Sequence, residues 1–262
     1  MLCMTALVVA AAVSAQRLVL LKNYGSNWDR EMVSTVNKAN GYIYRLREDV
    51  RALLPGVEET EGLQLFIAEP IDIGWLGLFR LPLAADDYNF VVVIYNQDQE
   101  PQQVVNLCDI TGNRYCEVQD VRWDADNHHL LFNMACPSYA SMIDGKGSKL
   151  YCYDVEHGRM VWETDYLVSN DIFIMNKKYV FCSYGFTNEK KFLFMLDKLT
   201  GKVYSKLPMV WSVQYMELQQ QNGKEVLYAV DYDERLYSFA ISNSPAPKRT
   251  TTTAKKKVAR RR

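Results

Sequence analysis

A repeat of 43 residues is the feature that most constrains how this chain can fold. Stretches with an apolar-aromatic start recur at Leu150, Leu193 and Leu236, which lie 43 residues apart both times. A looser relative begins at Val105, 45 residues before Leu150. Repeats of about 40 to 50 residues built from short strands are typical of propeller blades. The chain is therefore predicted to be an all-β propeller with four or five blades of four strands each.

One complete unit can be followed along the sequence. Val118–Trp123 and His128–Met134 are predicted strands on either side of a turn at Asp124–Asn127. The side chains of this turn can bond to their own backbone. Lys149–Asp154 and Arg159–Glu163 complete the four-stranded unit.

The same order of strands returns twice in the second half of the chain. The predicted strands are Asp171–Met175, Lys178–Ser183, Lys191–Asp197 and Lys202–Ser205, then Ser212–Leu218, Glu225–Val230 and Arg235–Ile241. The final unit is one strand short, which would leave an open sheet edge. The apolar stretch Arg17–Lys22 is predicted to complete this last blade and to close the ring.

The region before the clear repeats is predicted in less detail. Leu63–Ala68, Trp75–Leu81 and Phe90–Tyr95 have strand patterns, and the last is apolar on both faces, which indicates a central strand. A hairpin is predicted from Gln103–Cys108 and Arg114–Val118. A short helix is predicted at residues 28–38 with Asn27 as its N-cap, whereas residues 41–54 fit either a helix or two degenerate blade strands.

Two hairpins carry a family resemblance. LYCYDVEHGRMVWE and FLFMLDKLTGKVYSK each place an Asp, a turn and a Gly after an apolar-aromatic run. The matching residues are Asp154, Gly158, Val161 and Trp162 in the first, Asp197, Gly201 and Val203 in the second, and more loosely Asp109 and Gly112. The predicted core of the repeat is Leu150, Tyr151, Trp162, Leu193, Phe194, Leu236 and Tyr237. The Asp would cap the turn and the Gly would supply a positive φ.

This pattern resembles the inner-strand hairpin of quinoprotein-like, or WD40-like, β-propellers over about 90–241. Quinone-dependent dehydrogenases of that superfamily have more blades, bind calcium and carry further motifs. This chain is short and has no adjacent cysteine pair, so their activity is not carried over. The non-catalytic relatives are scaffold propellers, some of them in the bacterial cell envelope, and the resemblance implies a protein of that kind.

The residues that could bind a metal or take part in catalysis lack the partner residues that such sites need. His128 and His129 would point to opposite faces of a strand, which disfavours a shared metal ion. Asp124 and Asp126 lack the further ligands of a calcium loop, so a β-turn is favoured. Cys136 is interpreted as an inert loop thiol, and residues 145–148 as a loop without the spacing of a phosphate-binding motif. No catalytic residue, metal site or cofactor is predicted.

The N-terminus predicts export. Residues 1–15 form an apolar run that ends in Val13-Ser14-Ala15, which suits cleavage by signal peptidase before Gln16. The alternative is a buried first strand or helix. The run is too short to span a membrane. Five cysteines remain after cleavage, and their spacing alone neither supports nor excludes an oxidising compartment. The predicted location is secreted or periplasmic.

The charge is unevenly distributed along the chain. The last twenty residues hold eight basic residues and no acid, so the remainder has 22 basic against 31 acidic residues, a balance of −9. The basic residues are Lys248, Arg249, Lys255, Lys256, Lys257, Arg260, Arg261 and Arg262. Composition predicts disorder over 243–262, after a propeller domain at 16–242. The tail could bind an anionic polymer or a membrane surface, or only aid solubility; without aromatic residues it does not suggest sequence-specific nucleic-acid binding.

The predicted function is a non-catalytic binding module that engages protein partners. The loops at Cys136–Ser148 and Ser183–Lys190 are the predicted contact surface, because binding residues concentrate in loops on rigid scaffolds. The alternative is a hydrolase with its site at the central channel. Carboxylates and histidines clustered at one mouth of the channel would favour the hydrolase, and an apolar, neutral lining would favour the binding module.

Overall fold

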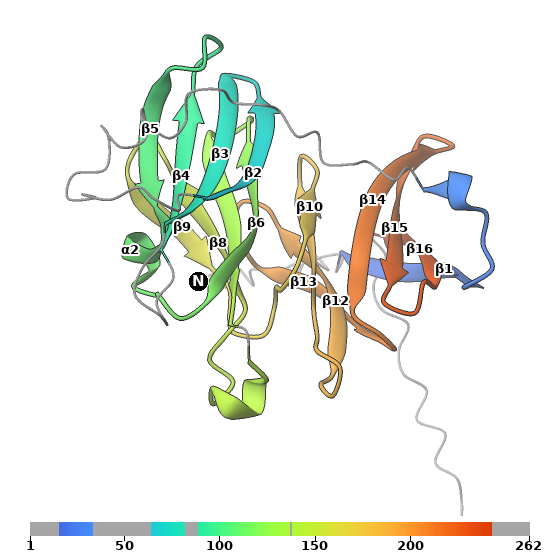
Figure 1. Ribbon diagram of the computed structural model, residues 1–262. Helices are drawn as coiled ribbons and strands as arrows, with labels where there is room; N and C mark the ends of the chain where they lie inside the picture. The colour runs from blue at the N-terminus through green and yellow to red at the C-terminus, as the bar shows by residue number, and fades with distance from the viewer. Residues whose placement is uncertain (1–15, 34–63, 82–88, 137, 243–262) are drawn as a thin grey trace, which may run out of the picture.

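The described residues form four antiparallel sheets of four strands each (Figure 1). The computed structural model describes residues 16–33, 64–81, 89–136 and 138–242. The first sheet contains β2 (Gln64–Ile71), β3 (Gly74–Leu81), β4 (Asn89–Tyr95) and β5 (Pro101–Asn106). The second contains β6 (Glu117–Asp124), β7 (His129–Ala135), β8 (Lys149–Asp154) and β9 (Arg159–Glu163).

The second half of the chain repeats this pattern. The third sheet contains β10 (Phe173–Met175), β11 (Tyr179–Tyr184), β12 (Lys191–Asp197) and β13 (Val203–Met209). The fourth contains β14 (Val213–Gln221), β15 (Lys224–Asp231), β16 (Leu236–Ser242) and β1 (Arg17–Gly25). Each sheet is a meander of neighbouring strands, which is the construction of a propeller blade. The predicted all-β propeller of four-stranded blades is confirmed.

The N-terminal strand completes the last sheet, as predicted. β1 pairs with β16 from Arg17 opposite Ser242 to Gly25 opposite Leu236. Because β1 is the outermost strand, this pairing closes the sheet and not the ring. In Figure 1 the first and fourth sheets stand at the two ends of an arc, so the described sheets do not form the closed ring that was expected.

The core lies between successive sheets. Leu150, Leu193 and Leu236 are fully buried, so the period of the repeat is the period of the core. Separate apolar clusters join the first sheet to the second, the second to the third, and the third to the fourth. All of Phe90–Tyr95 in β4 is buried, as its two apolar faces predicted. The other predicted core residues Tyr151, Trp162, Phe194 and Tyr237 are also buried.

The hairpin predicted around residues 109–113 is wrong. This segment holds a short helix, α2 (Leu107–Thr111), in the connection between the first two sheets. Asn106 caps it by accepting hydrogen bonds from the backbone N–H groups of Cys108 and Asp109. Gly112 ends it with φ of 66°. The local sequence resembles a hairpin turn, but β5 pairs with β4 and β6 pairs with β7, so the two strands never meet.

Of the helix predicted at residues 28–38, only residues 28–33 lie within the described part of the chain. A 3-10 helix, η1 (Arg30–Met32), is capped by Asp29 and not by Asn27. The Asp29 carboxylate accepts from the N–H of Glu31 at 3.0 Å. The alternatives for residues 41–54, the signal peptide at 1–15 and the basic tail at 243–262 all lie outside the described residues. Within the described ranges no helix is long and apolar enough to cross a membrane.

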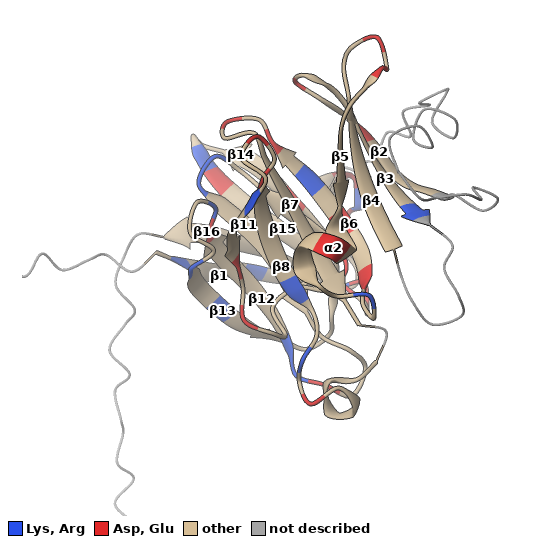
Figure 2. Cartoon of the chain, turned by 90° about the vertical axis from the view of Figure 1, so that its left-hand side faces the viewer, with Lys and Arg blue, Asp and Glu red and all other residues tan. Residues whose placement is uncertain are grey.

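Charged side chains are dispersed over the described sheets. In the view of Figure 2, acidic and basic residues alternate around the turns and sheet edges instead of gathering by sign. Surface ion pairs such as Lys149–Glu163 at 2.8 Å are of this kind. The acidic balance predicted for residues before the tail is therefore not concentrated into one patch on this face.

Candidate functional site

The two loops predicted as a contact surface meet at one end of the molecule. The loop between β7 and β8 contains a 3-10 helix, η2 (Ala140–Met142), and it touches the loop between β11 and β12. The rings of Tyr139 and Phe186 make an edge contact with centroids 6.1 Å apart. The backbone N–H of Ala140 donates to Oε1 of Glu189. We call the surface formed by residues 138–147 and 185–190 the loop platform.

Buried residues support the loop platform from the side of the protein core, and its outer side is exposed to solvent. Tyr184, which is buried at the end of β11, donates its hydroxyl to Oε2 of Glu189. Burial and this hydrogen bond raise the pKa of Tyr184, so its hydroxyl stays a donor at neutral pH. Tyr139 is 40% exposed and Met142 is 74% exposed. The two loops therefore present large apolar side chains to solvent, while the contacts of Glu189 with Ala140 and Tyr184 hold the loops in place.

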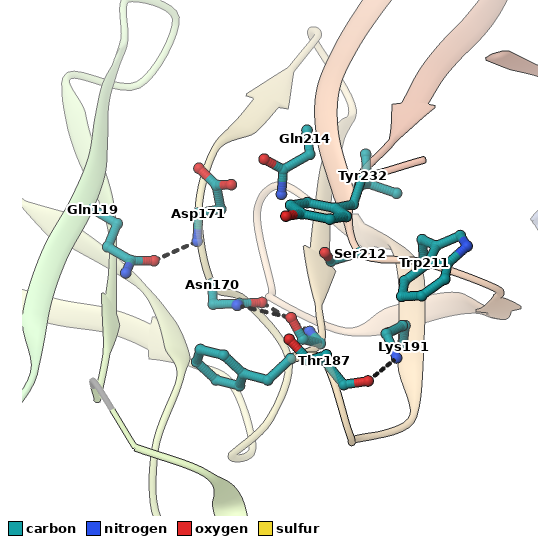
Figure 3. A pocket seen from close by; sticks show the side chains of 12 residues that line it. Gln119, Asn170, Asp171, Thr187, Lys191, Trp211, Ser212, Gln214 and Tyr232 are labelled. Carbon is teal, nitrogen blue, oxygen red and sulfur yellow. Dashed lines mark hydrogen bonds between the residues drawn. The ribbon is translucent and has the colours of Figure 1, made fainter. Parts of the chain in front are cut away.

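A cavity of about 330 Å³ lies beside the platform (Figure 3). Its walls come from the starts of β6, β10 and β14 and from the loops that precede β12 and β16. Asn170 is buried in one wall, where its side chain exchanges two hydrogen bonds with the backbone of Gly185, at 3.0 and 3.3 Å. Lys191 lies in another wall and donates to the carbonyl oxygens of Thr187 and Glu189 at 2.9 and 3.1 Å.

Irregular backbone directs three polar side chains to this cavity. Gln119 in β6 and Gln214 in β14 each sit at a register shift, where one residue of the strand has no partner across the ladder. Such bulges re-aim side chains. Asp171 has a left-handed backbone with φ of 64° and its N–H is accepted by the Gln119 side chain. Left-handed non-glycine residues cluster at functional sites.

Two aromatic rings form the remaining wall. Trp211 precedes β14 and Tyr232 follows β15, and their centroids lie 6.3 Å apart at an interplanar angle of 42°. The backbone N–H of Tyr232 donates to the carbonyl of Ser212 at 2.8 Å, which holds the two segments together. Tyr232 is 68% exposed. Figure 3 shows both rings on the side of the cavity opposite Gln119.

A second, larger cavity lies among the first strands of all four sheets. Its volume is about 610 Å³, and its lining is mainly apolar, with residues from β2, β6 and β14 and from the segment around β10. Arg122 of β6 pairs with Glu69 of β2 at 3.0 Å and with Asp120 at 3.1 Å. Asp120 is fully buried and also accepts from the backbone N–H of Phe173 at 3.0 Å. This chain of polar contacts joins three sheets.

The second cavity, which we call the central cavity, has two carboxylates in its lining, and both are hydrogen-bonded to neighbouring side chains. Glu69 is held by Arg122, and Glu217 accepts from the Tyr215 hydroxyl at 2.7 Å and from Gln219 at 2.9 Å. Burial by itself would lower the pKa of Arg122. The negative charges and hydrogen bonds of Asp120 and Glu69 have the larger combined effect, so the pKa of Arg122 is raised. Sequence reasoning missed this network. Asp120 and Arg122 lie two residues apart on one strand and therefore share a face, so their pairing could have been expected from the sequence. No sequence pattern indicated that Glu69 would join them.

The predicted turn residues lie at the far end of the blades from the loop platform. Asp154 accepts from the N–H of His157 at 3.0 Å, and Gly158 has φ of 64°. Asp197 accepts from the N–H of Thr200 at 2.9 Å, and Gly201 has φ of 68°. Asp109 does not occupy an equivalent turn, since it belongs to α2 and pairs with Arg114.

The cysteines separate into a pair and three thiols among the described residues. Cys116 and Cys136 form a disulfide across 20 residues, so the reading of Cys136 as a loop thiol is wrong. The pairing continues the ladder of β6 and β7 one residue beyond Glu117 and Ala135. The two cysteines lie about equally far from the predicted turn at Asp124–Asn127, which was the available signal. Cys152 and Cys182 are fully buried within strands, and burial raises the pKa of each thiol to about 12.

The remaining candidates have structural partners. The ring of His128 stacks on Trp123 at 5.8 Å, while Nδ1 of His129 lies 3.5 Å from the sulfur of Cys152. Asp124 accepts the ammonium of the buried Lys198 at 2.6 Å, and Asp126 accepts it at 3.4 Å. Across the part of the chain that the structure describes, no three metal-ligating side chains come together.

Comparison with known proteins identifies the fold alone. No family model matches the chain, and no curated protein matches its sequence. Among solved structures, Sqt1 of Saccharomyces cerevisiae aligns with a TM-score of 0.50 at 9% identity, over 74% of this chain and 48% of Sqt1. The chain thus spans about half the length of Sqt1. Sqt1 is a β-propeller, in agreement with the sheet topology.

Two further propellers align less well. The β-propeller domain of the Trilobed protease from Pyrococcus furiosus aligns at a TM-score of 0.43 and 12% identity, over 70% of this chain and 59% of that domain. A quinohemoprotein alcohol dehydrogenase from Pseudomonas putida aligns at 0.41 and 11% identity, over 71% of this chain and 40% of the dehydrogenase. Scores this low carry no inference about activity.

Proposed function

We propose that this protein is a non-catalytic β-propeller binding module that engages a protein partner through the loop platform. The observation that carries the proposal is the braced contact between the two loops, which presents Tyr139 and Met142 to solvent. Aromatic residues and methionine are enriched in protein interfaces. A surface that is already ordered has less conformational entropy to lose when a partner binds.

The central cavity supports binding over hydrolysis. A hydrolase would use carboxylates that are available to a substrate and to water. In this cavity the carboxylates of Glu69 and Glu217 are bonded to neighbouring side chains, and most of the lining is apolar. We further propose that the protein is a scaffold propeller of the quinoprotein-like type. The Asp-turn-Gly hairpin motif supports this assignment.

The proposed location is the cell exterior or the periplasm. The Cys116–Cys136 disulfide supports it, because disulfides persist in oxidising compartments. The apolar run at residues 1–15 supports it independently. N-terminal sequencing of the exported protein should read from Gln16, and recovery of intact Met1 from the soluble cytosol would defeat the proposal.

The platform is tested by capture of a partner and reconstitution with that purified partner. The double variant Tyr139→Asp, Met142→Asp should lower affinity at least tenfold, because it places charges at the apolar centre of the interface. Leu199→Asp is the matched control: Leu199 is 56% exposed and lies in the turn at the other end of β12. Equal loss from both variants, or from neither, would remove the platform from the interface.

A further inference from the structure

The small cavity beside the platform shares Gly185, Phe186 and Thr187 with it, and the other walls of this cavity have the features of a ligand site that the partner-binding proposal does not use. It lies at the lower end of the size range of small-molecule pockets, which is about 300 to 1,000 Å³. Its walls combine two aromatic rings with amide, hydroxyl and charged groups. A pocket of this kind accommodates one small polar group.

The hydrogen-bonding groups in the cavity are both aimed and available. The Gln119 carbonyl oxygen accepts from the Asp171 N–H, which leaves its amide nitrogen as a donor. Among the described residues, no hydrogen-bond partner is found for that nitrogen, for the Gln214 amide or for the indole N–H of Trp211.

The two bulges orient both glutamine side chains toward the same cavity. Gln119 and Gln214 occupy equivalent places, each near the start of the first strand of its sheet. A regular strand would send alternate residues to opposite faces of the sheet. At each register shift the strand instead carries an extra residue, and that residue is the glutamine that lines the cavity (Figure 3).

The charge of the cavity selects against ions. Its charged lining residues are Asp171 and Lys191, one of each sign. The Lys191 ammonium is held by two backbone carbonyls and lies 5.4 Å from the centroid of Trp211, where it would repel a second cation. The Asp171 carboxylate would repel an anion. The lining therefore suits a neutral ligand that both donates and accepts hydrogen bonds.

The aromatic wall narrows the ligand class. Trp211 and Tyr232 offer apolar faces beside polar edges, at 6.3 Å between centroids. The rings of neutral sugars have the complementary shape, with C–H groups on their faces and hydroxyls around their edges. We propose that this cavity binds one ring of a neutral oligosaccharide, with the sugar face against Trp211 and Tyr232 and its hydroxyls on Gln119 and Gln214.

The test uses the full chain and a panel of neutral oligosaccharides that includes cellotriose, chitotriose and maltotriose. Saturation-transfer NMR should detect at least one binder, and calorimetry should show a loss of at least tenfold in affinity for Trp211→Ala and for Tyr232→Ala. Tyr115→Ala is the matched control, since Tyr115 is 74% exposed and lies outside this cavity. The control should bind like the parent.

Three results would overturn the proposal. One is the absence of transfer to every sugar of the panel at millimolar concentration. Another is sugar binding that survives both aromatic substitutions. The third is tighter binding of Lys-rich or Glu-rich hexapeptides that is lost on Tyr232→Ala, which would assign the cavity to a peptide. If Trp211→Ala fails to fold, Tyr232→Ala and Gln214→Ala decide the matter, because both side chains are exposed.

This inference can fail independently of the proposed function. The single platform variant Met142→Asp should leave sugar binding unchanged, because Met142 does not line the cavity, whereas Tyr139 packs on Phe186, which does. Tyr232→Ala should leave partner capture unchanged. Loss of both activities in either variant would show that a single site had been divided in two.

Discussion

At the scale of single residues, the two hairpin glycines differ in what surrounds them. Both have positive φ, at 64° for Gly158 and 68° for Gly201. A Cβ at Gly158 would meet nothing closer than the Tyr153 hydroxyl at 3.7 Å, whereas a Cβ at Gly201 would lie 2.6 Å from the ring of Trp162. The same motif therefore has a local role in one turn and a packing role between sheets in the other.

The first prediction compares these two positions. Gly158→Ala should lower the free energy of unfolding by about 1 kcal/mol through backbone strain. Gly201→Ala should cost more, roughly 2–4 kcal/mol, because Trp162 must also move. Urea denaturation of both variants measures the difference. Equal losses would mean that Trp162 does not pack over Gly201.

The second prediction concerns acid stability. The backbone N–H of His157, aided by the His157 side chain, lowers the pKa of Asp154 to about 2. The depressed pKa means that the ionised form stabilises the fold above the unfolded value of about 4, and that this contribution is lost as the pH falls toward 2. Asp154→Asn should therefore flatten the decline in stability between about pH 4 and pH 2. A carboxyl that titrates near pH 4 by carbon NMR in the folded parent would refute it.

At the scale of elements, the N-terminal strand has the largest sequence separation from its partner. β1 pairs with β16 along its length, and Leu18 is buried in the cluster shared by the third and fourth sheets. The strand thus contributes hydrogen bonds to one sheet and apolar contact between two. Its register shifts near Leu20 and Asn23 leave Leu20 and Leu21 about half exposed on the outer edge.

The third prediction is the effect of removing this strand. Deletion of residues 17–22, with export preserved, should lower the melting temperature strongly and promote aggregation, because it exposes the edge of β16. Deletion of residues 243–262 is the control, and its melting temperature should stay within error of the parent, since composition predicts disorder there. Thermal scans with light scattering report both. A parent-like melt after the first deletion would exclude a stabilising role for β1.

At the scale of the whole molecule, sheets are joined by a few buried polar contacts as well as by apolar clusters. Lys198, in the turn after β12, has a side chain only 3% exposed, and its ammonium lies 2.6 Å from Asp124 in the second sheet. The carbonyl of Lys198 accepts from the Trp162 indole at 3.0 Å. Together with the Glu69–Arg122–Asp120 chain, this contact fixes how neighbouring sheets are oriented.

The fourth prediction tests the buried pair. Lys198→Met should destabilise by about 3–5 kcal/mol, because it leaves the Asp124 carboxylate buried without its counter-ion. Arg114→Met breaks a surface pair with Asp109 and should cost less than about 1 kcal/mol. Equilibrium unfolding separates the two. A loss below about 1 kcal/mol for Lys198→Met would show that water reaches Asp124.

The sequence by itself determined the strands of the second, third and fourth sheets, their order, the buried leucines of the repeat and the pairing of the N-terminal strand. These follow from alternation, turn residues and an unpaired edge, all of which are local patterns or simple counts. Only the tertiary structure decided that residues 107–111 form a helix, that Cys116 meets Cys136, that Glu69 reaches Arg122, and that two bulges turn Gln119 and Gln214 into one cavity. The helix depends on how the chain crosses from the first sheet to the second, and the disulfide on the exact register of β6 and β7. The Glu69–Arg122 pair and the shared cavity depend on how separate sheets pack, which leaves no periodic trace in the sequence.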